Sequence, residues 1–203
     1  MVWSGLAAAA LAAAPGAWAT EPPGPVSNCV AQRSHPWFAI ARAGVAAHLG
    51  RAVPPIAVYE CDIDVIGAGG MVAYFTPRDP KIVLYRRTVD KPVGFMETVT
   101  HELLHWMSVG RRTRPLTARQ ANFEEGLAEA VSLDLFPSLI AKVNGGYRFS
   151  ISPSGYQRQV AVVRDVSARM CGTSDWRSSC ARAFRVRLVN TPPEARPALL
   201  GQP

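Results

Sequence analysis

The chain contains no apolar run that is long enough to span a membrane near its start. The run Leu6–Ala14 is far shorter than the roughly 20 residues that a bilayer requires. Pro15 and Gly16 end it, and Ala17-Trp18-Ala19 then supplies the small residues of a signal-peptide cleavage site. We therefore predict a signal peptide over residues 1–19, cleaved after Ala19, and a periplasmic or secreted protein without a stable membrane anchor.

Cysteine and histidine are scarce, and no two cysteines have the spacing of a structural zinc site. There are four of each in 203 residues, and no Cys-x-x-Cys pair occurs. A cysteine-based zinc site is therefore disfavoured. An even number of cysteines in an exported chain predicts two disulfides, with three possible connectivities. We favour Cys29–Cys61 and Cys171–Cys180, because they close the two shortest loops.

The chain also lacks an acidic excess: 22 basic against 15 acidic residues give a formal net charge of +7. Such a charge can indicate a nucleic-acid or membrane partner. Here the arginines are scattered, and the densest group is only Arg111, Arg112 and Arg114. We expect a solvated basic surface and no nucleic-acid partner. The oligomeric state is not predicted by the sequence.

The apolar spacing predicts an α+β fold in which a small sheet precedes most of the helices. A Pro-rich, extended lead-in over residues 20–30 comes first, and one domain follows over residues 31–190. Short β-branched and aromatic runs predict strands at Ile56–Glu60, Met71–Thr76 and Ile82–Thr88. Helical spacing predicts helices over Ala31–Gly50, Val93–Val109, Ala121–Leu135, Tyr156–Met170 and Asp175–Leu188. Residues 191–203 are Pro-rich, and we expect a flexible tail there.

Residues 101–105 read His-Glu-Leu-Leu-His within one predicted helix. His101 and His105 are four residues apart, so they lie one turn apart on the same face and can bind one ion. Glu102 lies next to them, where its carboxylate can reach a water on that ion. The alternative is a helix with two surface histidines, but Leu103, Leu104 and Trp106 make the surroundings apolar. The pattern predicts a catalytic zinc site with Glu102 as general base.

A catalytic zinc site takes a third protein ligand, and the metzincin pattern does not supply it. That pattern requires a glycine and a third histidine at positions that hold Ser108 and Arg111 here. The cysteines are expected to be paired. A carboxylate from elsewhere remains, and Glu124 and Glu125 in the next predicted helix are the candidates.

At this point the chain resembles the gluzincin metallopeptidases, in which HExxH is followed by a helix with a Glu ligand in a Glu-Gly-x-Ala context. The order of elements is similar over about residues 55–135. The matching residues are His101, Glu102, His105, Glu125, Gly126 and Ala128. The resemblance implies a zincin-like domain that holds one Zn²⁺ through His101, His105 and Glu125, and that hydrolyses peptide or protein substrates. Glu124 remains the competitor for the third position.

Gly126 and Glu129 carry two further expectations. A helical glycine costs about 1 kcal/mol relative to alanine, so we expect a close packing contact at Gly126. Glu129 lies one turn beyond Glu125. The resemblance implies that a carboxylate at this position orients His101 through its far ring nitrogen. The family usually has Asp there, and a solvated Glu is the alternative.

Residues for substrate binding are less well defined. The resemblance suggests that Gly70–Phe75 is an edge strand that pairs with an extended peptide. Tyr147 and Tyr156 are both candidates for the donor that stabilises the oxyanion, and either also suits a core position. Gly172–Asp175 partly matches an aspzincin pattern, but it lies far from His105 and lacks the following Tyr-Gly, so Asp175 is not taken as a ligand.

Two other functional classes remain open. One is a catalytically inactive, zincin-like exported protein that binds zinc or a partner. The other is a basic exported binding protein in which His-Glu-Leu-Leu-His is accidental. The sequence does not distinguish an endopeptidase from an exopeptidase.

Overall fold

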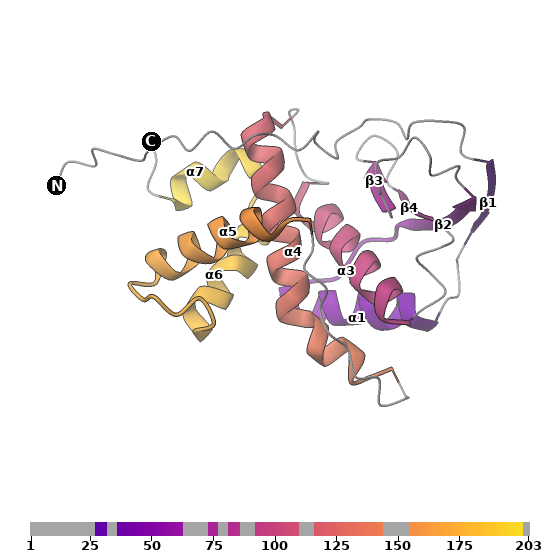
Figure 1. The fold of residues 1–203 in the computed structure, drawn as a ribbon, viewed down its shortest axis with the longest axis horizontal. Helices are drawn as coiled ribbons and strands as arrows, with labels where there is room; N and C mark the ends of the chain where they lie inside the picture. The colour runs from indigo at the N-terminus through magenta and orange to yellow at the C-terminus, as the bar shows by residue number, and fades with distance from the viewer. Residues whose placement is uncertain are drawn as a thin grey trace.

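The computed structural model describes residues 27–31, 36–62, 73–76, 81–85, 92–109, 116–143 and 155–200. The predicted signal peptide and Tyr147 lie outside these ranges. No helix within them is both long and apolar enough to cross a membrane. The described strands precede all but one of the described helices, so the α+β expectation is confirmed (Figure 1).

The described strands form one mixed sheet in the order β1-β2-β4-β3. β2 and β4 are parallel, and the two outer strands are antiparallel to their neighbours. Because β3 ends this order, one side of it faces away from the sheet. The strands are β1 (Ser27–Ala31), β2 (Ala57–Asp62), β3 (Ala73–Thr76) and β4 (Lys81–Tyr85).

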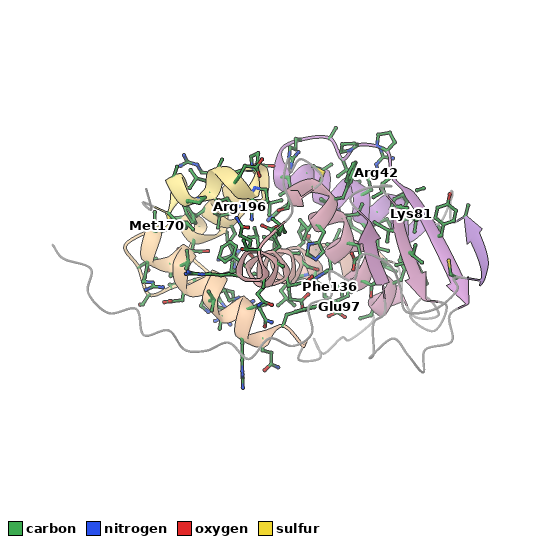
Figure 2. The ribbon with its side chains drawn as sticks, turned by 90° about the horizontal axis from the view of Figure 1, so that it is seen from above. Arg42, Lys81, Glu97, Phe136, Met170 and Arg196 are labelled. Atoms are coloured by element: carbon green, nitrogen blue, oxygen red, sulfur yellow. A yellow bond between two sulfur atoms is a disulfide. The ribbon has the colours of Figure 1, made fainter. Side chains whose placement is uncertain are left out.

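The described helices lie in layers beside the sheet, with α3 and α4 in the middle of the molecule (Figure 1). The sheet lies beside α3, while α5 and α6 lie on the opposite side of α4. Figure 2 looks nearly along α4 and shows the same division. The helices are α1 (Pro36–Leu49), α3 (Pro92–Val109), α4 (Ala118–Ile140), α5 (Gln157–Met170), α6 (Ser179–Asn190) and α7 (Arg196–Leu199).

The first part of the domain differs from its prediction. Residues 27–31, expected as lead-in and helix start, form β1 on the edge of β2. α1 begins at Pro36, where the fixed φ of proline suits the first helical position and its missing N–H leaves no bond unmade. The domain therefore includes residues before position 31.

α4 is longer at both ends than the predicted Ala121–Leu135. Thr117 caps its start, because the backbone N–H of Gln120 donates to Thr117 Oγ1 and Gln120 Oε1 accepts from the Thr117 N–H. The helix also continues through Pro137. A proline inside a helix costs about 3 kcal/mol, because it removes one backbone hydrogen bond and its ring clashes with the preceding turn. Burying Leu139 and Ile140 stabilises by about 1.5–3 kcal/mol for each side chain, which offsets this cost.

The C-terminal segment also differs from expectation. α6 begins at Ser179 rather than at residue 175, because Ser178 Oγ accepts a hydrogen bond from the Ala181 N–H. Where a flexible tail was expected, the 3-10 turn Pro193–Ala195 and α7 follow, and the Arg196 side chain is buried.

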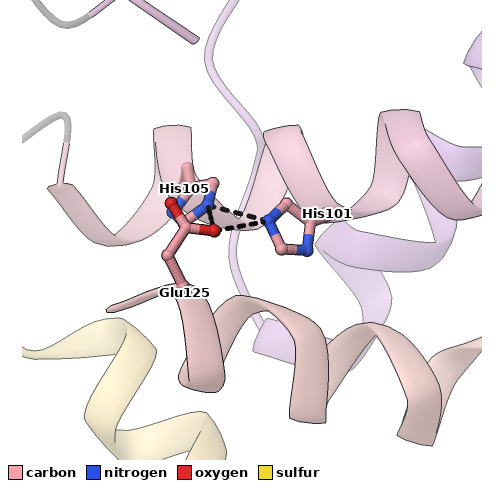
Figure 3. Close-up of side chains that lie close together, drawn as sticks. All are labelled: His101, His105 and Glu125. Carbon is pink, nitrogen blue, oxygen red and sulfur yellow. Dashed lines mark hydrogen bonds and ion pairs between the residues drawn. The ribbon is translucent and has the colours of Figure 1, made fainter. Parts of the chain in front are cut away.

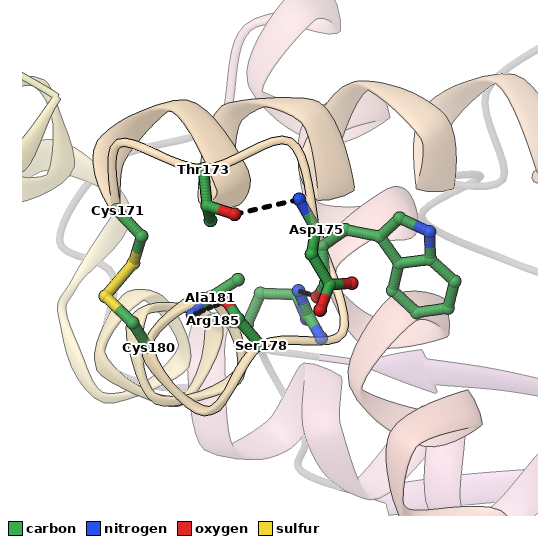
Figure 4. Close-up of a disulfide and its surroundings, with 8 residues drawn as sticks. Cys171, Thr173, Asp175, Ser178, Cys180, Ala181 and Arg185 are labelled. Atoms are coloured by element: carbon green, nitrogen blue, oxygen red, sulfur yellow. Dashed lines mark hydrogen bonds between the residues drawn. A yellow bond between two sulfur atoms is a disulfide. The ribbon is translucent and has the colours of Figure 1, made fainter.

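A disulfide closes the loop between α5 and α6 (Figure 4). It joins Cys171 to Cys180, as predicted. Asp175 is exposed in this loop, and its carboxylate accepts a hydrogen bond from the Arg177 N–H, which is a structural use. Cys61 is also disulfide-bonded. Its predicted partner, Cys29, has a side chain outside the described residues, so that pairing stays a prediction.

Candidate metal centre

Three side chains from two helices converge on one point (Figure 3). His101 and His105 extend from α3, and Glu125 extends from α4. The Nε2 atoms of the two histidines are 2.9 Å apart. Glu125 Oε2 lies 3.2 Å from His101 Nε2 and 3.4 Å from His105 Nε2. All three side chains are buried, so this group can hold a metal ion.

The spacing of these donor atoms suits a single small ion. Zinc binds imidazole nitrogen and carboxylate oxygen at about 2.0–2.2 Å in tetrahedral geometry, which places neighbouring donors roughly 3.3 Å apart. The observed separations of 2.9, 3.2 and 3.4 Å are close to this value. If a tetrahedral ion were bound, these three protein donors would leave one of its positions open.

Glu129 lies on the far side of His101 from this point. Its Oε2 is 3.0 Å from His101 Nδ1, and both side chains are buried. A hydrogen bond from Nδ1–H to this carboxylate fixes the ring orientation and leaves the Nε2 lone pair for a metal. The structure therefore brings Glu129 to the position that the sequence suggested.

The carboxylates also control the charge of the cluster. Burial lowers the pKa of His101, but the hydrogen bonds to Glu125 and Glu129 outweigh burial and hold that pKa well above its usual value. Burial would raise the pKa of Glu125, yet His105 and His101 hold it well below its usual range. In the absence of a metal, His101 thus keeps a proton that an incoming ion must displace.

Glu102 is buried beside the cluster without belonging to it. Its pKa is raised, first by burial and also by the charge of Glu125, whereas His101 and His105 lower it. A raised pKa makes a carboxylate in such a position a better proton acceptor than an ordinary glutamate.

Tyr156 is the residue immediately before α5, and its side chain covers the cluster of His101, His105 and Glu125. Its ring stacks on His101, with centroids 5.5 Å apart and planes 18° apart. Burial, the charges of Glu125 and Glu102, and a hydrogen bond to Glu125 together raise the pKa of its phenol. The hydroxyl therefore stays protonated and can donate a hydrogen bond.

Gly126 explains how α5 comes this close. A Cβ atom at this position would lie 2.5 Å from the backbone oxygen of Gln159, a distance that real contacts do not allow. Because position 126 has no side chain, α4 can approach the first turn of α5. This close approach keeps Tyr156, the residue before that turn, next to His101. The close packing expected at Gly126 is therefore present.

Glu124 has partners of its own. Its carboxylate forms an ion pair with Arg196 and accepts a hydrogen bond of 2.5 Å from Ser108 Oγ. Arg196 Nη2 in turn donates to Ser108 Oγ at 2.5 Å. Glu125, rather than Glu124, thus joins the two histidines. Sequence reasoning missed the roles of Ser108 and Arg196, because 88 residues separate them and no local pattern links them.

Searches with protein-family models, among curated proteins and among solved structures found no match for this chain.

Proposed function

We propose that this protein is a zinc-dependent peptidase of the gluzincin type. The single observation that carries the proposal is the convergence of His101, His105 and Glu125 from α3 and α4. Two imidazoles and one carboxylate are a donor set typical of catalytic zinc sites, whereas Ca²⁺ and Mg²⁺ prefer all-oxygen sets. The order of sheet, HExxH helix and ligand-bearing helix supports a zincin-like fold.

The residues around the cluster supply the remaining steps of peptide hydrolysis. When bound, zinc polarises the scissile carbonyl and lowers the pKa of its water to about 7. Glu102 accepts the proton of the attacking water on its carboxylate and then passes it to the leaving amine nitrogen. The Tyr156 hydroxyl donates a hydrogen bond to the carbonyl oxygen as negative charge develops there. Glu129 keeps His101 in the tautomer that binds the metal.

An extended peptide is the substrate that suits this arrangement. β3 ends the sheet and lies alongside α3, which carries both histidines and Glu102. A peptide that adds to the outer side of β3 would pair its backbone with the strand that contacts the helix carrying these residues. The Cys171–Cys180 disulfide supports an oxidising compartment, and therefore an exported enzyme.

The test compares wild type with Glu102→Gln. We expect about one zinc per chain in both, cleavage of a broad peptide library by wild type, and a loss of at least about 100-fold in the variant, as for removal of a general base. Asp165→Asn, the same carboxylate-to-amide change at an exposed residue of α5, serves as the matched control and should cleave like wild type.

Two outcomes would contradict the proposal in different ways. Equal cleavage by Glu102→Gln and wild type would exclude Glu102 as the base. Zinc binding without any cleavage would instead indicate a zincin-like protein that binds zinc or a partner without turnover.

A further inference from the structure

A buried charged cluster lies directly behind the metal centre. It consists of Arg196 on α7, Glu124 on α4 and Ser108 on α3, which are respectively 3%, 1% and 3% exposed. Glu124 immediately precedes Glu125, and Ser108 is three residues beyond His105. The cluster therefore joins α3 and α4 within one turn of two of the three donors.

Arg196 connects these two helices to the C-terminal part of the chain. Its Nη1 forms an ion pair with Glu124, and its Nη2 donates to Ser108 Oγ at 2.5 Å. Its Nε donates to the backbone oxygens of Leu188, at 2.8 Å, and Thr191, at 3.0 Å. The planar guanidinium thus has donors fixed in three directions, which makes it a rigid link. In Figure 2, Arg196 lies on the same side of α4 as the C-terminal helices.

Stability is a weak explanation for such a cluster. Buried ion pairs pay a large desolvation cost, and apolar residues of similar volume often stabilise a fold as well or better. What apolar residues cannot reproduce is directional bonding, which fixes how far α4 is rotated and shifted against α3. That relationship sets where the Glu125 carboxylate lies relative to His101 and His105.

We propose that Arg196 is a positioning residue for the metal centre: it holds α3 and α4 in the register that brings Glu125 onto the two histidines. The C-terminal segment of residues 191–200 thereby controls metal affinity without contacting the metal. This inference rests on the proposed function only in requiring that His101, His105 and Glu125 bind zinc.

The experiment measures metal binding by the full chain after signal-peptide removal. Arg196→Met and Arg196→Lys are compared with wild type and with Arg187→Met, a matched change at an exposed arginine of α6. Zinc affinity is measured by competition with a chelator, and the visible spectrum of the Co²⁺-loaded protein reports donor geometry. Thermal unfolding of the zinc-free proteins reports stability separately.

Arg196→Met should weaken zinc binding by about 10- to 100-fold, as the loss of outer partners of metal ligands does. It should also shift the Co²⁺ spectrum, while Arg196→Lys restores part of the affinity and Arg187→Met binds like wild type. A merely structural role would lower the thermal midpoint and leave both the affinity of the folded protein and the spectrum unchanged, which would overturn the proposal.

If Arg196→Met does not fold, Ser108→Ala decides, because it removes the two hydrogen bonds that α3 makes to Arg196 and Glu124 and leaves the Arg196–Glu124 ion pair in place. A weakened affinity in this variant supports the proposal, and an affinity within about twofold of wild type overturns it. Failure of the wild type to bind zinc would be a different result, since it would refute the proposed metal centre itself and leave Arg196 nothing to position.

Discussion

The carboxylate of Glu129 lies 3.0 Å from His101 Nδ1, on the opposite side of the imidazole from Glu125. His101 is therefore held between two glutamates of one helix, four residues apart. Glu125 lies beside Nε2, the nitrogen that faces the proposed metal, and Glu129 accepts a hydrogen bond from Nδ1–H. This arrangement makes the ring orientation depend on α4 as well as on α3.

Replacing Glu129 tests that dependence. Glu129→Ala removes the acceptor of the Nδ1–H bond, so we expect zinc affinity to fall by about 10- to 100-fold. Glu129→Gln keeps an oxygen acceptor and should have a smaller effect. Chelator competition measures both, with Asp165→Asn, a change at an exposed carboxylate of α5, as control. Zinc affinity of Glu129→Ala within twofold of wild type would show that the contact does not orient the ring.

Gly126→Ala tests the packing of α4 against α5. The added methyl group would meet the Gln159 backbone at 2.5 Å, so one helix must move. Overpacking of this kind costs about 1–3 kcal/mol, and the gain in helix propensity returns only about 1 kcal/mol. Because the clash is with backbone atoms, the cost lies toward the upper end of this range, and urea unfolding should show a net loss approaching about 2 kcal/mol.

The matched control for this change is Gly155→Ala, because a Cβ atom there has no neighbour within 4 Å. This variant should unfold at nearly the same urea concentration as wild type. If Gly126→Ala were as stable as the control, the packing of α4 against α5 would not require glycine at position 126.

His48, in the last turn of α1, gives the fold a pH dependence that is independent of the metal. Burial lowers its pKa; Asp134 raises it, while Arg185 and Arg182 lower it further. Its folded pKa is therefore below the unfolded value of about 6.5. The stabilisation is present above about pH 6.5 and is lost as pH falls toward the folded pKa, because the unfolded chain binds the proton first.

Urea unfolding at pH 8 and pH 5.5, with a chelator present, measures this effect. Wild type should lose more stability on acidification than His48→Gln, because glutamine at position 48 cannot take up a proton while all other groups are the same in the two proteins. Equal losses in the two proteins would mean that His48 titrates alike in the folded and unfolded states.

Local sequence patterns were sufficient for the parts of the site that lie on single helices. Four-residue spacing placed His101 and His105 on one face of α3, and the unfavourable glycine at position 126 pointed to a close contact. The capping box of Thr117 and Gln120 was not identified from the sequence, so the helix start was predicted later than its observed position.

Other features depend on contacts between distant segments. α4 continues through Pro137 because the residues beyond it are buried in the core, which the local penalty of proline does not reveal. Arg196 was placed in a flexible tail, since a Pro-rich end gives no sign of a buried acidic partner. Glu124 and Glu125 are neighbours of the same type, and only the partners of Glu124 separate them.

The metal content of the purified protein is the decisive test of the proposed metal centre. Wild type, His105→Ala and His48→Gln are loaded with zinc, dialysed extensively and measured by mass spectrometry of the metal. We expect about one zinc per chain for wild type and for His48→Gln, and almost none for His105→Ala. Wild type without zinc, or His105→Ala with as much zinc as wild type, would contradict the assignment of this centre.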